Sequence, residues 1–468
     1  MNGSENGRIA VDVNNMFRQN LGGEGGLKLE QVERMKEEVE EAHRTLSEDR
    51  PGFMELPFQQ DDVVKRILQL SEERQDRYDN FVVLGIGGSA LGNIALQNAL
   101  NPPYYNENED LRSGRPRLYV PDNVDPVRFD RLLATLDLER TVFNVISKSG
   151  TTAETMSLYL IARQRVAEEV GEENVQDHFI ATTSSHSGYL LKIARRENYP
   201  RFAIPDDVGG RFSVLSPVGL VSAAFCGIDI EGLLDGAADM ARRCEEEDLW
   251  QNPAYLHGTL QYLAYQEGNK MSVMMPYSHQ LRDVADWYRQ LWAESLGKAE
   301  NRRGESVNVG PTPIKALGAT DQHSQIQLYM EGPDDKVINF IEVEEHGRDV
   351  EIPELYQDLD GVNYLGGHRL SNLLNTEKQA TELALSSRGR MNSTIIMPRV
   401  NARTLGQLLY MLELETALAG ELFNINAFDQ PGVELGKNYT YGVMGRDGYE
   451  EKREEFYERA EPDEDFIL

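Results

Sequence analysis

The stretch FVVLGIGGSALG, residues Phe81 to Gly92, decides the class of fold that the chain can adopt. Its four leading apolar residues are typical of a strand buried on both faces of a parallel sheet. A loop of glycines with one serine follows, and residues 93–100 carry a helical pattern that ends before two prolines. Strand, glycine loop and helix in this order predict the first unit of an α/β fold, with a loop whose backbone N–H groups can approach a ligand.

The same pattern recurs along the chain. TVFNVI (141–146) precedes SKSGTT and a helical stretch at 153–170, and HFIAT (178–182) precedes a polar turn and a further helix. A second series of apolar strands and helices begins near residue 269. Alternating strands and helices predict parallel sheets built from βαβ units. We therefore expect a helical N-terminal extension (1–60), a first α/β unit (61–240), a helical connector (241–268), a second α/β unit (269–428), and a C-terminal segment with a charged tail (429–468).

The composition restricts the class of protein. The chain has 468 residues, of which 40% are hydrophobic and 27% charged, as in soluble globular proteins. Its net charge of −31 argues against nucleic acid or an anionic membrane as a partner. Two cysteines form no disulfide framework, and the polar start MNGSENGRIAVDV has no apolar signal core, so we expect a cytoplasmic protein. Lysine makes up 12 of the 47 basic residues, against 78 acidic ones, which suggests a surface adapted to high salt.

Two loops rich in small and polar residues follow predicted strands. In the first, Gly85, Gly87 and Ala90 match the spacing G-x-G-x-x-A of a dinucleotide-binding loop, and a plain tight turn is an equally good interpretation. The second, SKSGTT (147–152), offers four hydroxyls and one ammonium directly before a helix. One hydroxyl is enough to cap a helix, whereas a phosphate monoester needs many donors. The second loop therefore favours a phosphate site, with the first loop as its other half.

Two residues are candidates for chemistry at a sugar. Arg211 follows two glycines in GGRFS, where the backbone allows close approach, so it could stabilise a developing oxyanion. Glu294, in WAESLGK, lies on the flank of the apolar stripe of a helix predicted at 280–297, beside Trp287, and could act as a general base. The ordinary alternatives are a surface salt bridge for the arginine and a solvated helix position for the glutamate.

Two further stretches carry candidate residues. In ATDQHSQIQLYMEG the pattern places His323 in the first turn of a helix capped by Thr320 or Asp321. The positive end of a helix disfavours an imidazolium, so a neutral imidazole there could pass on a proton near pH 7. FDQPGVELGK brings Gln430 and Lys437 together, although a single lysine is usually exposed to solvent. The sequence has no HExxH, paired CxxC, G-x-x-x-x-G-K-[ST] or G-x-S-x-G motif, so metal, nucleoside-triphosphate and serine-hydrolase chemistry have no support.

These stretches, taken in order, resemble those of the glucose-6-phosphate isomerase family. Each is modest alone, but the ordered set is specific and spans Gly85 to Lys437, about three-quarters of the chain. The length is similar to that of the shorter bacterial-type enzymes. The matching stretches are GIGGSALG, SKSGTTAET, GGRFSVLSPVGL, ESLGK, TDQHSQIQLYMEG and FDQPGVELGK.

The resemblance implies two sugar-isomerase (SIS) domains, each a doubly wound parallel sheet, in a homodimer with His323 supplied across the interface. It implies reversible isomerisation of D-glucose 6-phosphate and D-fructose 6-phosphate through ring opening and a cis-enediol, with no metal or organic cofactor. The residues implied to hold the phosphate are Gly88, Ser89, Ser147, Ser149 and Thr152, with Lys148 beside them.

The same resemblance assigns roles at the sugar. Glu294 moves a proton between C1 and C2, and Arg211 stabilises the enediolate. His323 and Lys437 assist ring opening, and Gln430 contacts the substrate. Departures from the family pattern are small: ESLGK has a leucine where members often carry a more polar residue, and the segment 300–319 matches nothing that we can assign.

Three other functions remain open at this stage. Another SIS-domain isomerase, acting on a mannose or amino-sugar phosphate, would carry the same phosphate loops. A non-catalytic phosphosugar-binding regulator would keep the loops but would not need Glu294, His323 and Lys437 together. A nicotinamide-dependent dehydrogenase would use the glycine loop and leave SKSGTT without a purpose.

Overall fold

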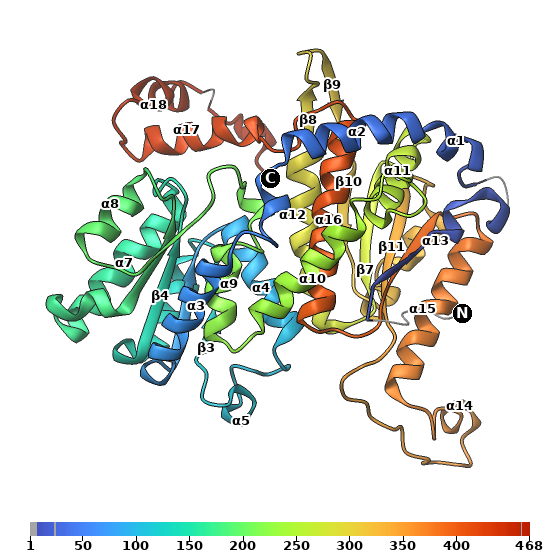
Figure 1. Ribbon diagram of the computed structural model, residues 1–468, viewed down its shortest axis with the longest axis horizontal. Coiled ribbons are helices and arrows are strands. Elements are labelled where there is room, and N and C mark those ends of the chain that lie inside the picture. The colour runs from blue at the N-terminus through green and yellow to red at the C-terminus, as the bar shows by residue number, and fades with distance from the viewer. Residues whose placement is uncertain (1–6, 23–24, 460) are drawn as a thin grey trace.

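The computed structural model describes residues 7–22, 25–459 and 461–468, so the first six residues of the polar N-terminal stretch lie outside the described residues. Two five-stranded sheets stand on either side of a central layer of helices (Figure 1). The prediction of a mixed α/β fold with parallel sheets is confirmed. The α-helices that surround the sheets are α1 (Leu29–Arg34), α2 (Lys36–Asp49), α3 (Asp61–Arg74), α4 (Gly88–Leu100), α5 (Glu109–Arg112), α6 (Pro126–Thr135), α7 (Ala153–Val170), α8 (Tyr189–Arg196), α9 (Pro217–Phe225), α10 (Ile230–Arg243), α11 (Pro253–Gln266), α12 (Arg282–Leu296), α13 (Ile326–Glu331), α14 (Asp360–Asn363), α15 (Leu370–Ser387), α16 (Ala402–Leu422), α17 (Glu434–Val443) and α18 (Glu450–Tyr457).

The first sheet is wholly parallel, with the strand order β3-β2-β4-β5-β6. Its members are β2 (Asn80–Leu84), β3 (Arg117–Tyr119), β4 (Thr141–Ile146), β5 (Phe179–Thr183) and β6 (Arg201–Ala203). The chain leaves β2 toward one side for β3 and returns to the other side for β4. The topological switch point, where open α/β sheets bind ligands, therefore lies between the carboxyl ends of β2 and β4.

The four parallel strands of the second sheet repeat this order, since β10-β7-β11-β12 corresponds to β3-β2-β4-β5. The sheet runs β1-β12-β11-β7-β10, and its members are β1 (Ala10–Asp12), β7 (Met271–Pro276), β10 (Thr312–Lys315), β11 (Lys336–Val343) and β12 (Asn392–Met397). β7, β10, β11 and β12 are parallel, whereas β1 pairs antiparallel to β12. The N-terminal extension, expected to be helical, thus contributes the edge strand of a sheet that is formed mainly by residues 271–397.

Alternating side chains divide the core into three layers. Phe81 and Val83 of β2 pack into the central core, whereas Val82 and Leu84 pack with α7 and α8 on the outer face. In the second sheet, Met274 faces the central core and Val273 faces an outer one. Both sheets are therefore covered on both faces, which explains why their strands read as continuous apolar runs. The central layer contains α9, α10, α11, α12 and α16.

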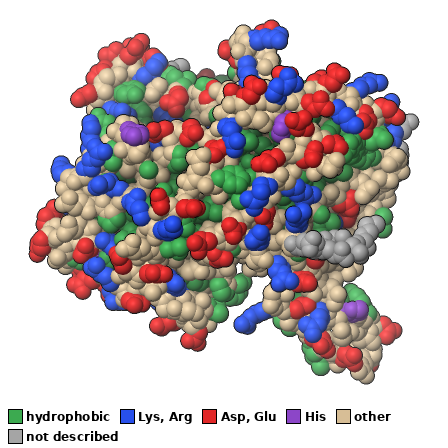
Figure 2. Space-filling model, viewed as in Figure 1, with side chains coloured by type: hydrophobic (Ala, Val, Ile, Leu, Met, Phe, Trp, Pro, Cys, Tyr) green, Lys and Arg blue, Asp and Glu red, His purple; other side chains and the backbone are tan. Residues whose placement is uncertain are grey.

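Three parts extend from this body (Figure 1). The hairpin of β8 (Lys298–Glu300) and β9 (Ser306–Val309) projects at the top, and α17 and α18 form a C-terminal pair beside the first sheet's unit. The segment around α14 projects from the opposite end of the second unit. Figure 2 shows acidic and basic side chains interspersed over the visible face. Among the described residues, no helix combines the length and apolarity needed to cross a membrane.

Candidate active site

The glycine loop after β2 is the beginning of a helix. The sequence pattern places the helix start near residue 93, but α4 begins at Gly88, so Gly88 and Ser89 form its first turn. Gly87 has φ of +56°, a conformation that side chains rarely adopt. A Cβ on Gly88 would lie 2.2 Å from the carbonyl carbon of Gly210. The loop therefore needs glycine both to turn and to bring α4 against the segment that carries Arg211.

The loop SKSGTT lies at the carboxyl end of β4, next to the end of β2. The Ser147 hydroxyl accepts a hydrogen bond from the Gly150 backbone N–H (3.0 Å) and lies 3.1 Å from the Thr152 hydroxyl. The Ser149 and Thr151 hydroxyls lie 2.8 Å apart, and Ser149 is exposed. The hydroxyls thus organise one another into a compact turn at the N-terminus of α7, with exposed and half-buried donors at its rim.

Lys148 is anchored inside this arrangement. Its Nζ donates to the backbone carbonyls of Asp206 and Val208, the second at 3.3 Å. The ammonium therefore links the loop to the segment that leads into Gly209–Ser213. Its positive charge lies beside the loop, but two of its three donors are already used in the chain.

Arg211 is buried and fully engaged. Its side chain is 1% exposed, and it lies in the short 3-10 helix η7 (Gly210–Phe212). Nε donates to the Ser295 hydroxyl at 2.6 Å, and Nη1 contacts both the Gln430 side-chain oxygen at 2.5 Å and Glu294 at 3.4 Å. Nη2 donates to the backbone carbonyls of Ala427 (2.5 Å) and Asp429 (3.0 Å). Burial lowers the pKa of Arg211, while the neighbouring carboxylates oppose this shift, so the guanidinium remains a cation.

Glu294 lies in the last turn of α12 with its side chain 26% exposed. One carboxylate oxygen is 3.4 Å from Arg211 Nη1 and accepts from Gln290 Nε2 at 3.3 Å. Trp287, the tryptophan that the sequence placed beside Glu294 on the flank of the apolar stripe, is buried. A carboxylate held beside a cation, with a part of its surface open to solvent, is suited to receive a proton from a substrate.

Three residues that the sequence did not single out complete this cluster: Ser295, Lys298 and Asp429. Ser295 binds Arg211 through its hydroxyl and is fully buried. Lys298 is 8% exposed and donates to the backbone carbonyls of Glu294 (3.0 Å) and Ser295 (2.8 Å). Its Nζ is also 3.7 Å from Asp429. Lysine directly after ESLG was the available signal for the two local carbonyl contacts, whereas the contact with Asp429 depends on the tertiary fold.

The two C-terminal candidates, Gln430 and Lys437, lie in different parts of the structure. Gln430 joins the cluster through Arg211. Lys437, on α17, is exposed and pairs with Glu434 at 2.9 Å. Tyr441 lies one helical turn further along α17, and its hydroxyl donates to the backbone carbonyl of Thr151 at 3.4 Å. α17 therefore contacts the SKSGTT loop, while Lys437 makes no hydrogen bond or ion pair with Arg211 or Glu294 in residues 7–22, 25–459 and 461–468.

The predicted setting of His323 is wrong in one respect. His323 is the last residue of the 3-10 helix η9 (Thr320–His323), and α13 begins only at Ile326, with Gln325 as its N-cap. The Asp321 side chain accepts from the Leu317 backbone and the Ser324 hydroxyl, so it organises a turn before the helix. Burial is the largest single influence on the pKa of Asp321 and raises it. The hydrogen bonds together lower this pKa by more, so the net shift is downward. His323 itself is exposed and, in the part of the chain that the structure describes, has no hydrogen bond or ion pair with Arg211, Glu294 or the SKSGTT loop.

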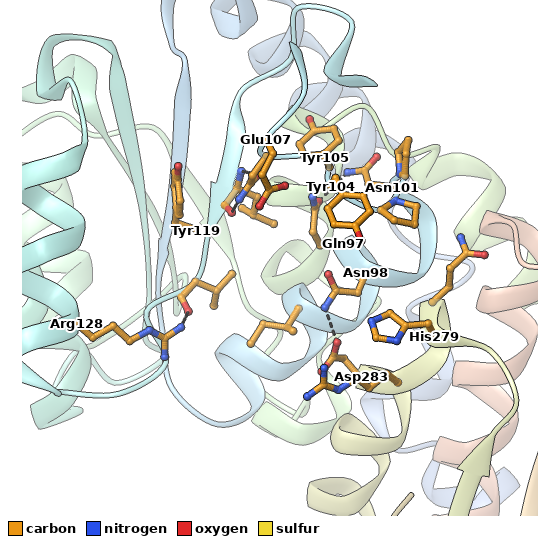
Figure 3. Close-up of a pocket in the computed structure, with 18 residues that line it drawn as sticks. Gln97, Asn98, Asn101, Tyr104, Tyr105, Glu107, Tyr119, Arg128, His279 and Asp283 are labelled. Carbon is orange, nitrogen blue, oxygen red and sulfur yellow. Dashed lines mark hydrogen bonds between the residues drawn. The ribbon is translucent and has the colours of Figure 1, made fainter. Parts of the chain in front are cut away.

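A separate cavity of about 530 Å³ lies between α4 and the start of α12 (Figure 3). Its lining includes Gln97, Tyr104 and His279, and Asn98 donates to Asp283 within it. Arg128, at one end, is already paired with Asp122 at 2.7 Å. None of the candidate site residues lines this cavity, so it is not the candidate active site.

Comparison with known proteins gives concordant matches. A model of the family described as phosphoglucose isomerase matches residues 73–458. The glucose-6-phosphate isomerase of Carboxydothermus hydrogenoformans is 49% identical over 452 residues, which cover 96% of this chain and 97% of that protein. The solved structure of a hypothetical protein from Thermus thermophilus has a TM-score of 0.84 at 36% identity, over 93% of this chain and 100% of that one. A solved glucose-6-phosphate isomerase from Chlamydia trachomatis has a TM-score of 0.72 at 26% identity, over 84% of this chain and 75% of that one.

Proposed function

The chain belongs to the phosphoglucose isomerase family, and on this premise we propose that it interconverts D-glucose 6-phosphate and D-fructose 6-phosphate. The observation that carries the chemical proposal is the contact between Glu294 and Arg211, at 3.4 Å, beside the switch point of the first sheet. The reaction moves hydrogen between two neighbouring carbons and needs a base and a stabiliser of the enediolate in one place. The substrate is a phosphosugar, and the reaction needs no net oxidant or reductant.

We propose that Glu294 is the base. Once the sugar ring is open, the carboxylate removes the proton from C2 of the aldose and the C1 oxygen takes up the negative charge of the enediolate. The hydroxyl proton of O2 passes to O1, and Glu294 returns a proton to C1 as the C2 carbonyl forms, which gives the ketose. Arg211 stabilises the oxyanion, because a buried guanidinium already oriented by five acceptors needs no reorganisation when the charge develops.

The phosphate is proposed to lie between the two loops at the switch point. Gly88 and Ser89 provide the first turn of α4, and Ser147, Ser149 and Thr152 provide hydroxyls in the turn that precedes α7. Two helix N-termini with hydroxyl donors suit a dianion. Lys148 supplies positive charge beside the loop, where its hydrogen bonds to two backbone carbonyls hold it.

Ring opening is proposed to use His323 and Lys437, with His323 supplied by a second copy of the chain. His323 is exposed, which is compatible with a role at another subunit's site. The segment around α14 projects from the body (Figure 1). It exposes apolar side chains that a soluble monomer would be expected to cover. Its exposed apolar residues are Val350, Leu355, Tyr356, Leu359, Val362 and Tyr364. We propose that this segment contributes to a homodimer.

The activity is tested by following conversion in both directions without added cofactor, for the wild type, Glu294→Gln and Glu300→Gln. Glu300 is an exposed glutamate six residues after Glu294 and serves as the matched control. Glu294→Gln is expected to lose turnover while retaining phosphosugar binding, and Glu300→Gln to behave as the wild type. A Glu294→Gln variant with normal turnover would refute the base assignment, and an inactive wild type would refute the proposed reaction.

A second candidate function is a similar reaction on a sugar phosphate that differs from glucose 6-phosphate at C2. An isomerase or epimerase acting on mannose 6-phosphate or an amino-sugar phosphate would use the same loops and base. Comparing kcat/KM for glucose 6-phosphate with that for these sugars distinguishes the functions, and we expect glucose 6-phosphate to be strongly preferred.

We also propose two properties of the protein's surroundings: a reducing cytoplasm and a high salt concentration. Cys226 and Cys244 are buried free thiols, and burial raises the pKa of each to about 12, which is compatible with a reducing cytoplasm. The lysine-poor, acidic composition is proposed to be an adaptation to high salt. Measuring the melting temperature against KCl concentration tests the second proposal, and an unchanged melting temperature with full activity in the absence of salt would refute it.

A further inference from the structure

Ser295 is a buried serine that holds the guanidinium of Arg211. Both residues are closed to solvent, with the Arg211 side chain 1% exposed and Ser295 0% exposed. Arg211 Nε donates to the Ser295 hydroxyl at 2.6 Å, and within residues 7–22, 25–459 and 461–468 no other acceptor is found for Nε. A buried, charged donor without an acceptor is costly, so this contact fixes one edge of the guanidinium.

The contacts of Arg211 differ from one nitrogen atom to the next. Nη2 is held by two backbone carbonyls, at 2.5 and 3.0 Å, and Nε is held by Ser295. Nη1 instead contacts two side chains of the candidate site, Gln430 and, at the longer distance of 3.4 Å, Glu294. Because the guanidinium is a rigid planar fork, holding Nε and Nη2 determines where Nη1 points. Nη1 is therefore the nitrogen directed at the proposed base.

Ser295 also ties this cation to the helix that carries the proposed base. Glu294 and Ser295 are consecutive residues in the last turn of α12, and their side chains contact Nη1 and Nε of the same guanidinium. The Lys298 ammonium binds the backbone carbonyls of both residues, at 3.0 and 2.8 Å, which holds this turn in place. The Ser295 hydroxyl therefore joins the base and the cation into one unit.

We propose that Ser295 is a positioning residue for the isomerisation: its hydroxyl orients Arg211 so that Nη1 meets the oxyanion of the enediolate as the charge develops. The inference rests on the proposed function, in which Arg211 stabilises that oxyanion. Donors that are already oriented stabilise a transition state because they need no reorganisation during the reaction. Without its acceptor at Nε, the guanidinium has to regain this orientation in each turnover. Loss of the hydroxyl should therefore lower kcat, whereas KM, which depends largely on the phosphate loops, should change little.

The experiment measures kcat, KM and thermal melting for the wild type, Ser295→Ala and a matched control, Ser71→Ala. Ser71 is another buried serine, 2% exposed, and its hydroxyl joins α3 to α9 by donating to the backbone carbonyl of Ala224. We expect Ser295→Ala to lower kcat about tenfold and to leave KM within about twofold of the wild type, because misorienting an oxyanion donor costs less than the roughly 10²–10³ lost on removing it. Ser71→Ala should melt earlier and keep both kinetic constants.

A double-mutant cycle shows whether Ser295 acts through Arg211. Lysine has a carbon atom where arginine has Nε, so it offers Ser295 no donor at that position. In the Arg211→Lys background, Ser295→Ala should therefore lower kcat by less than about twofold. The same tenfold loss in both backgrounds would show that the hydroxyl acts independently of Arg211, which would overturn the inference.

The outcomes separate this inference from the proposed function. If Ser295→Ala melts earlier and keeps the wild-type kcat, as the control does, Ser295 is only structural and the inference is overturned. If Ser295→Ala does not fold, Ser295→Cys decides, because a thiol of similar size is a weak acceptor, and a wild-type kcat for this variant overturns the inference. If the wild type does not isomerise the sugars, or Glu294→Gln remains active, the proposed function fails instead.

Discussion

Glu413→Gln should stabilise the protein, and by an amount that grows with pH. Glu413 lies in the centre of α16, where it is 0% exposed. Neither carboxylate oxygen has a hydrogen-bond partner among the described residues. Burial raises the pKa of Glu413 well above its ordinary value of 4.5, so the folded protein holds the carboxyl in its neutral form.

The sign of the effect follows from proton linkage. Above pH 4.5 the unfolded chain releases this proton and the folded protein keeps it, so the free energy of unfolding falls as pH rises, until the folded group also ionises. The fall is about 1.4 kcal/mol per pH unit for one group. Glutamine has nearly the same shape and cannot ionise, so it removes this dependence. Between pH 5.5 and 7.5 the advantage of the variant should increase by up to about 3 kcal/mol, the limit for a carboxyl that stays protonated in the folded state.

Urea unfolding at pH 5.5, 6.5 and 7.5 measures this difference for the wild type, Glu413→Gln and the exposed control Glu300→Gln. The control should track the wild type at each pH. A difference between Glu413→Gln and the wild type that stays constant with pH, or a variant that is less stable at pH 7.5, would show that Glu413 is ionised and paired in the folded state.

Three further substitutions test the site and the proposed assembly. Arg211→Lys should lower kcat/KM by about 10²–10³, because an ammonium cannot serve the acceptors that the guanidinium holds, and steady-state kinetics would contradict this with a loss below tenfold. Ser147→Ala should raise KM about tenfold with a smaller change in kcat, since the Gly150 N–H loses its acceptor and the loop loosens; a change in kcat alone would argue against a phosphate role. Leu359→Glu should shift the sedimenting species from dimer to monomer and reduce activity, whereas an unchanged dimer would exclude this segment from the interface.

The sequence predicts the central strands well and the edges poorly. β2 and β4 are buried on both faces, so their apolar runs are continuous and easily recognised. The edge strands β1, β3, β6 and β10 are three or four residues long and carry polar side chains, so nothing in their local pattern distinguishes them from loops. β10 lies in the segment 300–319, which matches no pattern at all.

In the candidate site, too, the sequence predicts the features that depend on local periodicity and misses those that depend on contacts between distant segments. The position of Glu294 follows from helical periodicity, and its partly exposed setting beside a buried Trp287 is what that pattern predicted. The pattern misplaces the start of α4 because glycine is a poor helix former, and here the need for close contact with Gly210 outweighs that preference. The contacts of Ser295, Lys298 and Asp429 join segments distant in sequence, so no local pattern could identify them.

We propose that Glu294 moves a proton between C1 and C2 through an enediol. Isomerisation of glucose 6-phosphate in D₂O, with the fructose 6-phosphate analysed by NMR, tests it most directly. A proton carried by a carboxylate that is 26% exposed exchanges with solvent, so the wild type should accumulate deuterium at C1 of the product over repeated turnovers. Glu294→Gln should give neither product nor deuterium incorporation above background. Rapid isomerisation without solvent deuterium, or deuterium incorporation by Glu294→Gln at the wild-type rate, would contradict the account.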